Sequence, residues 1–144
     1  MNIQKKAETI AALQGREIPV IIGIGTDIVD NKRLYNILER VGERFLSRVY
    51  TPREIELCTN SKGLKVQSLA ARFAGKEAVA KALGTGIGPV GWKEIEIVAD
   101  ASGAPTVKLT GKALEQARRQ GICQTKISLS HTEEYSVAFV LLTG

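Results

Sequence analysis

Two acidic residues stand where a carboxylate could take part in chemistry rather than only face solvent. From about Leu64 to Leu83 apolar residues recur at helical spacing, which predicts one long helix. At about 100° per residue, Glu77 falls in the middle of the apolar stripe of this helix. An ion pair with Lys81, one turn further on, is the ordinary explanation, but such an exposed pair contributes only about 0.2 to 0.5 kcal/mol. We therefore interpret Glu77 as a functional carboxylate.

Asp27 follows a short β-rich run, Val20–Ile24, and so lies at the end of an expected strand. An acid at such a junction is most often a helix cap or a turn residue. Together with Glu77, however, it gives a pair of carboxylates in a chain that has one histidine and no Cys/His ligand cluster. Such a pair suits a hard ion such as Mg²⁺, which keeps waters and substrate phosphates as its other ligands, and does not suit zinc. The sequence therefore predicts a magnesium site formed by Asp27 and Glu77.

Cations and glycines surround Glu77 in the sequence. The same helix carries Arg72, Lys76 and Lys81, and it ends in a glycine-rich loop. Glycines let a backbone approach a phosphate closely, and nearby cations neutralise its charge. The alternative is a solvated basic face followed by a flexible loop. The loop begins with Gly84, Thr85, Gly86 and Ile87.

His131 is the only histidine, and Thr132 follows it in the connection between two expected strands. A lone histidine is more often a structural hydrogen-bonding residue than a catalyst, but its place on a connection favours a functional role. Both interpretations stay open.

Composition narrows the class of protein. The 144 residues predict one domain, and the net charge of +5 suits a polyanionic partner of any kind. Only 5% of the residues are aromatic, which argues against an RNA-binding module with stacking side chains. No apolar run approaches the ~18 residues that span a bilayer, and residues 1–20 lack the apolar core of a secretory signal. We expect a cytoplasmic protein with no membrane and no nucleic-acid partner.

The expected elements give an α+β domain with a largely antiparallel sheet. After the strand at 20–24 we predict helices from 31 towards 40, from the capping box at Thr51, and over 64–83. A hairpin of strands 94–99 and 106–109, a helix over 110–120, and strands 126–130 and 135–142 complete the order.

Four segments together resemble the successive motifs of the holo-acyl-carrier-protein synthases, a family of 4′-phosphopantetheinyl transferases. They are GIGTDIVD (Gly23–Asp30), RFAGKEAVAKALGTGIG (Arg72–Gly88), SGAP (Ser102–Pro105) and SLSHTEEYSVAFV (Ser128–Val140). The resemblance covers about Ile21 to the C-terminus, and the second segment is its most specific part. It implies a phosphopantetheinyl transferase domain over residues 20–144. Residues 1–19 form an N-terminal extension that such proteins usually lack.

The resemblance implies an activity and an assembly. The family transfers 4′-phosphopantetheine from coenzyme A to a serine of apo-acyl carrier protein, releases adenosine 3′,5′-bisphosphate, and supports fatty acid biosynthesis. Its small α+β domain forms a homotrimer with active sites between subunits. A carrier-binding regulator without activity is the competing hypothesis, but it would have no reason to keep Asp27, Glu77 and Lys81 together.

Residue roles follow from the same resemblance. Asp27 and Glu77 match the magnesium ligands, and Lys81 matches a lysine near the coenzyme A phosphates. His131 and Thr132 match a segment that completes the cofactor site from a neighbouring subunit. The nucleotide-contacting region is matched by Arg72, Lys76 and the loop of Gly84, Thr85, Gly86 and Ile87. The base that deprotonates the serine stays open between Glu77, acting directly or through a water on the metal, and His131.

A basic stripe suggests where the acidic carrier protein binds. Four arginines stay within about 80° of one another if the predicted helix continues past Gly42. The alternative is a solvated face in which these cations alternate with Glu39 and Glu43. The stripe consists of Arg33, Arg40, Arg44 and Arg48.

Overall fold

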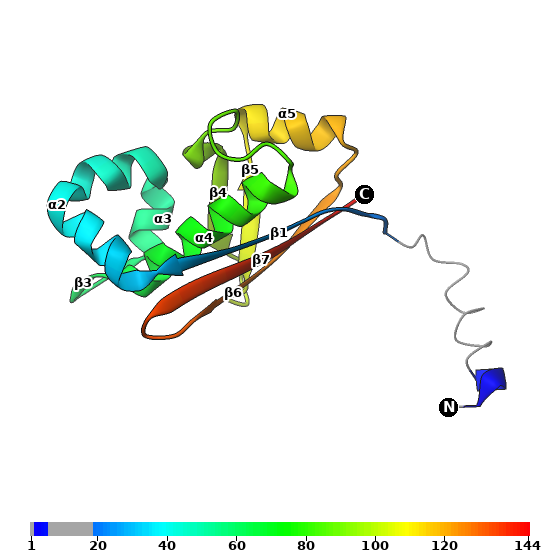
Figure 1. Ribbon diagram of the computed structural model, residues 1–144, viewed down its shortest axis with the longest axis horizontal. Helices are drawn as coiled ribbons and strands as arrows, with labels where there is room; N and C mark the ends of the chain where they lie inside the picture. The colour runs from blue at the N-terminus through cyan, green and yellow to red at the C-terminus, as the bar shows by residue number, and fades with distance from the viewer. Residues whose placement is uncertain (1, 6–18) are drawn as a thin grey trace.

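The computed structural model describes residues 2–5 and 19–144, so most of the predicted extension lies outside the described residues. The domain is α+β, as predicted (Figure 1). In chain order its elements are β1 (Ile21–Asp30), α2 (Asn31–Val49), α3 (Pro52–Leu57), β2 (Thr59–Asn60), β3 (Gly63–Leu64), α4 (Val66–Ala82), the 3₁₀ turn η1 (Trp92–Glu94), β4 (Ile95–Ala99), β5 (Pro105–Leu109), α5 (Gly111–Arg119), β6 (Gln124–His131) and β7 (Tyr135–Thr143).

The main sheet has three antiparallel strands in the order β1-β7-β6, and β4 and β5 form a separate hairpin. The first and last strands therefore pair with each other, with Asp27 opposite Ala138 and Asp30 opposite Tyr135. This pairing explains why β1 continues to Asp30, whereas the expected strand stopped at Ile24. Asp27 consequently lies within a strand and not on the loop that follows one.

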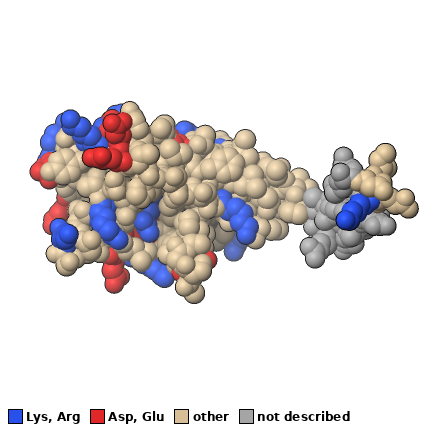
Figure 2. All heavy atoms as spheres, turned by 90° about the horizontal axis from the view of Figure 1, so that it is seen from below, with Lys and Arg blue, Asp and Glu red and all other residues tan. Residues whose placement is uncertain are grey.

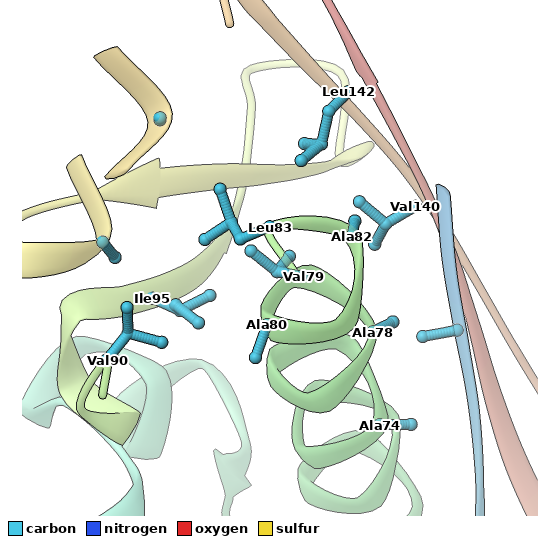
Figure 3. Packing of buried hydrophobic residues seen from close by; sticks show 13 residues of the cluster. Ala74, Ala78, Val79, Ala80, Ala82, Leu83, Val90, Ile95, Val140 and Leu142 are labelled. Carbon is cyan, nitrogen blue, oxygen red and sulfur yellow. The ribbon is translucent and has the colours of Figure 1, made fainter. Parts of the chain in front are cut away.

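Helix α4 lies along β1 at the centre of the molecule (Figure 1). Ten of its 17 residues are buried, so it has no single apolar stripe. Figure 3 shows Ala78 and Ala82 pointing towards the strands, while Val79 and Leu83 point to the side where Ile95 lies. Small residues face the sheet because the helix backbone approaches it closely.

Glycines on β1 permit that close approach. A Cβ atom on Gly25 would collide with the backbone carbonyl of Ala78, and one on Gly23 with the carbonyl of Ala82. Backbone atoms of a helix cannot move aside as a side-chain tip can, so β1 must carry glycine at both positions. The strand that carries Asp27 is thereby held directly against the helix that carries Glu77.

Helices α2 and α3 begin at the predicted caps. The Asp30 carboxylate accepts a hydrogen bond from the backbone N–H of Arg33 (3.0 Å), and Thr51 with Glu54 forms the capping box. Helix α2 runs on to Val49, past the predicted end near Arg40. Just after it, the Tyr50 hydroxyl donates to the Leu69 carbonyl (2.9 Å) and ties the end of α2 to α4.

The remaining predicted elements are present with small shifts of their ends. The short β2–β3 hairpin was not predicted, because two-residue strands leave no periodic signal. Across residues 2–5 and 19–144, no helix combines the length and apolar composition needed to cross a membrane.

Candidate functional site

Asp27 and Lys81 form an ion pair between β1 and α4. The Lys81 ammonium donates to Asp27 Oδ1 (2.9 Å) and to the backbone carbonyl of Thr26 (3.0 Å). The Asp27 side chain is 19% exposed and the Lys81 side chain 51%. Lys81 thus pairs with the strand acid and not with Glu77, so the ordinary explanation of Glu77 as its helical partner is wrong.

Glu77 is half-buried on the same helix, one turn before Lys81. Burial, and after it the negative charge of Asp27, raise the pKa of the Glu77 carboxyl above its usual value, while the Lys81 charge opposes them. Two carboxylates that repel each other in a partly buried pocket form a site where binding of a cation would relieve the repulsion between them. The structure therefore brings together the three residues that the sequence singled out, Asp27, Glu77 and Lys81.

These residues line a pocket of about 590 Å³ between β1, α2 and α4. Its polar lining also includes Asp30 and Arg33, and the rest of its lining is largely apolar. The apolar wall is made of Leu34, Ile37, Phe45 and Phe73. A pocket lined by both charged and apolar side chains suits a ligand with an ionic group and a long uncharged arm.

The donor set of the pocket fits Mg²⁺. Within residues 2–5 and 19–144, no group of three or more His, Cys, Asp or Glu side chains is arranged to hold a metal. Mg²⁺ does not need such a group, because one or two carboxylates with waters and phosphate oxygens complete its octahedron. Asp27 and Glu77, both on the open pocket, supply that minimum.

The surroundings of Lys76 do not support the predicted contact with the nucleotide. The residue is fully buried, and its ammonium lies 2.8 Å from Glu54 Oε2 and donates to the backbone carbonyls of Trp92 (2.9 Å) and Ile95. Burial lowers the pKa of Lys76, and the Glu54 charge opposes that shift. All three ammonium hydrogens have acceptors, which leaves none for a phosphate. The sequence pattern missed this because α4 is buried on nearly every side.

Arg72 and the glycine loop lie outside the pocket of Asp27 and Glu77. The Arg72 guanidinium donates to the carbonyls of Ile97 (3.0 Å) and Ser68 (3.3 Å), which directs it towards β4. Gly84 and Gly86 have φ of +75° and +64°, so the loop needs glycine at both positions. Thr85 and Ile87 lie on this loop, and Thr85 lines a second pocket of about 310 Å³ beside α5.

His131 and Thr132 stand at the end of β6, where the chain turns into β7. His131 is exposed and does not line the pocket of its own chain. Thr132 organises the turn, since its hydroxyl accepts from the backbone N–H groups of Glu134 (3.2 Å) and Tyr135 (3.0 Å). The predicted contribution to a neighbouring subunit stays a prediction.

The arginine stripe is exposed along α2, because the helix continues past Gly42 as the prediction required. Arg33 also lines the pocket, whereas Arg40, Arg44 and Arg48 lie beyond it. Figure 2 shows cations and anions side by side at the end of the molecule where α2 and α3 lie. The stripe therefore extends to the pocket along a surface that carries both positive and negative charges.

Comparison with known proteins decides the family. The profile of the 4′-phosphopantetheinyl transferase superfamily matches residues 23–140. The chain belongs to this superfamily. The resemblance read from the four sequence segments is thus confirmed.

Proteins similar to this phosphopantetheinyl transferase include several holo-[acyl-carrier-protein] synthases. The holo-[acyl-carrier-protein] synthase of Koribacter versatilis is 46% identical over 85% of this chain and 98% of its own length. The synthase of Gloeobacter violaceus is 48% identical over 84% of this chain and 92% of its own length. The crystal structure of the synthase from Neisseria meningitidis matches with a TM-score of 0.76 at 41% identity, over 85% of this chain and 98% of the other. A Helicobacter pylori synthase in complex with coenzyme A matches with a TM-score of 0.73 at 33% identity, over 83% and 98%.

Several residues of this transferase escaped the sequence analysis. Gly23 and Gly25 were given no role of their own, yet they set the distance between β1 and α4. The apolar wall with Phe45 and Phe73 had the ordinary spacing of core residues, and only the fold shows that it faces a pocket. Alternation of glycine with the β-branched residues Ile24 and Thr26 was the signal available for the close approach.

Proposed function

We propose that this chain transfers 4′-phosphopantetheine from coenzyme A to a serine of apo-acyl carrier protein and so supports fatty acid biosynthesis. The observation that carries the proposal is the meeting of Asp27, Glu77 and Lys81 in one pocket. The resemblance in sequence implies that these positions bind the metal and the phosphates. In the reaction the serine oxygen forms a bond to phosphorus, the phosphorus–oxygen bond to adenosine 3′,5′-bisphosphate breaks, and the serine proton passes to a base.

Asp27 and Glu77 would hold Mg²⁺, which offsets the charge of the coenzyme A pyrophosphate when bound. Lys81 has a half-exposed side chain and lines the same pocket. Its charge is placed to stabilise the leaving bisphosphate as negative charge develops on it. The Asp27 contact holds the lysine in this position before substrate arrives.

Glu77 is the base that the geometry favours. Its carboxylate lines the pocket, whereas His131 of the same chain does not. His131 of a neighbouring subunit stays the alternative. Substitution of each residue in turn, with the pH dependence of turnover measured, separates the two roles.

The carrier protein binds along α2 in this proposal. Arg33 at the pocket and Arg40, Arg44 and Arg48 beyond it give a line of cations that leads to the transfer site. Acidic groups on a carrier helix would meet them and place the serine over Asp27 and Glu77. A cytoplasmic location, predicted from the sequence, fits this partner.

A homotrimer would cover the outer face of the sheet. Alternate residues of β1 and β7 point away from α4, and the large exposed side chains there include Ile24 (62%), Ile28 (62%) and Phe139 (49%). Phe139 lies opposite Thr26, between the two isoleucines, so the three form one apolar patch. Burying such a patch against second and third copies is favourable. It would also bring His131 of one copy towards the pocket of another.

An assay of the reaction tests the proposed function. The protein is incubated with coenzyme A, Mg²⁺ and an apo-acyl carrier protein, and the carrier mass is measured. We expect the gain of one phosphopantetheine, its loss in excess chelator, and its return when Mg²⁺ exceeds the chelator. No gain with Mg²⁺ present, or an unchanged rate in chelator, contradicts the reaction or the metal respectively.

A further inference from the structure

Lys76 and Glu54 form a buried pair at the junction of four elements. Both side chains are fully inaccessible to solvent and their charged atoms are 2.8 Å apart. Lys76 on α4 also donates to the carbonyls of Trp92 and Ile95, where η1 leads into β4. Glu54 on α3 accepts from the backbone N–H of Ile97 on β4 (2.8 Å). The pair therefore fixes backbone groups that no regular ladder satisfies.

A row of aromatic rings connects this junction with the pocket. The Trp92 ring stacks on Phe73 with centroids 4.8 Å apart, and Phe73 stacks on Phe45 at 6.0 Å. The three rings come from η1, α4 and α2. Phe45 and Phe73 are part of the apolar wall of the pocket. The Trp92 carbonyl that Lys76 holds thus belongs to the residue at the far end of this row.

The row and the glycine contact hold different walls of the pocket. Asp27, Glu77 and Lys81 lie on β1 and α4, and these elements touch through backbone at Gly25. Helix α2, with the arginine stripe, contacts α4 through side chains that include the ring of Phe45. A weakened row would therefore move α2 before it moved the groups assigned to coenzyme A.

We propose that Lys76, together with Glu54, is a positioning residue that holds Trp92 and, through the aromatic row, sets α2 against α4 for binding of the carrier protein. Stability alone does not explain the pair, because apolar residues often replace a buried ion pair without loss. The inference rests on the proposed function. It assigns Lys76 to the acceptor side of the site, although the sequence suggested the nucleotide side.

The test replaces Lys76 by methionine, which keeps the length of the side chain and removes the three donors. Trp92 is the only tryptophan of the chain, so its fluorescence and iodide quenching report its surroundings without any assay of activity. We expect stronger quenching in Lys76→Met and a carrier KM raised about three-fold or more, with the coenzyme A KM within about two-fold of wild type. Lys93→Met, an exposed neighbour of Trp92, is the matched control and should change none of these.

A double variant separates positioning from stability. Lys76→Met leaves the Glu54 carboxylate buried without its cation, which lowers stability. Glu54→Gln with Lys76→Met removes that charge and should recover part of the stability, but not the quenching or the carrier KM. If both return to wild type as stability returns, the pair is only structural and the proposal is wrong.

Trp92→Leu covers the case in which the Lys76 variants fail to fold. It removes the ring at the end of the row, which does not line the pocket, and keeps the backbone carbonyl that Lys76 holds, so it should raise the carrier KM while sparing the coenzyme A KM. Equal changes in both KM values, or none, overturn the inference. Absence of transfer by the wild-type protein would refute the proposed function instead, whereas the Trp92 quenching in Lys76→Met would still report whether the pair holds the row.

Discussion

At the scale of single residues, the position of Glu77 in the pocket lowers the stability of the folded protein. Glu77 lies beside Asp27 in a partly buried place, and both effects raise the pKa of its carboxyl. The folded protein therefore retains the Glu77 proton to a higher pH than the unfolded chain does. Between the two pKa values the folded state binds more protons, so stability falls as pH rises through that interval. Lys81 offsets part of this effect through its charge.

Glu77→Gln tests this linkage in metal-free protein. The variant should unfold at about the same denaturant concentration as wild type at a pH below the unfolded-state pKa. Above the folded-state pKa it should be the more stable of the two, by up to about 1 kcal/mol because solvent screens a half-buried group. Urea unfolding in chelator over a pH series measures the difference. A stability difference that stays constant with pH contradicts the account.

At the scale of elements, the contact between β1 and α4 positions the two carboxylates. Gly25 precedes Asp27 by two residues and so faces the same side of the strand. Its missing Cβ lets the strand rest on the carbonyl of Ala78, which follows Glu77 on α4. The separation of Asp27 from Glu77 is thus set by backbone contact, which is stiffer than contact between side chains.

Gly25→Ala should therefore harm both stability and activity. Overpacking of this kind typically costs about 1 to 3 kcal/mol, and β1 must shift away from α4 to accommodate the methyl group. Gly42→Ala is the control: it lies within α2, has nothing within 4 Å of its added Cβ, and should stabilise by about 0.5 to 1 kcal/mol. Urea unfolding and turnover measure both. Normal turnover in Gly25→Ala would show that the close approach does not position the site.

Sequence patterns predicted most elements because their signals are local. Caps at Asp30 and Thr51 fixed the starts of α2 and α3, and the carboxylates stood out by their chemistry. The length of β1 depends on pairing with β7, more than 100 residues away, so no local pattern contains it. Lys76 was misplaced for a related reason, since its partner Glu54 lies on another helix.

At the scale of the whole molecule, the arginine stripe on α2 extends from the pocket along the surface. The structure divides the arginine stripe into Arg33, which lines the pocket, and three arginines that do not. Arg33 alone is close enough to affect both substrates. The other three are expected to act on the carrier protein only.

Arg40→Glu with Arg44→Glu should raise the carrier KM strongly and leave the coenzyme A KM nearly unchanged. Each exposed ion pair contributes only about 0.2 to 1 kcal/mol, so single changes should have effects of a few-fold. Salt near 0.15 M, where the Debye length is about 8 Å, should weaken wild-type carrier binding, and the double variant should lose that dependence. The carrier KM at saturating coenzyme A is the measurement. Damage to coenzyme A binding instead would place these arginines at the nucleotide site or between subunits.

Hybrid assemblies test the trimer. If His131 acts on the pocket of a neighbouring copy, mixing Glu77→Gln with His131→Ala after mild dissociation should restore part of the activity. Such mixtures contain interfaces in which the intact Glu77 and the intact His131 meet. Light scattering on the wild-type protein provides the second measurement, and a fully active monomer is incompatible with the proposed assembly.

Comparing two acids in two pockets tests most directly where the transfer takes place. Glu77 lines the pocket beside Asp27, and Glu115 lines the second pocket beside α5. With coenzyme A, Mg²⁺ and an apo-acyl carrier protein, the wild-type protein and Glu115→Gln should both add one phosphopantetheine to the carrier, read by intact mass. Glu77→Gln should remain folded and add it at least about 100-fold more slowly, the scale of a lost general base. Equal rates for all three proteins would contradict the assignment of transfer to the pocket between β1, α2 and α4.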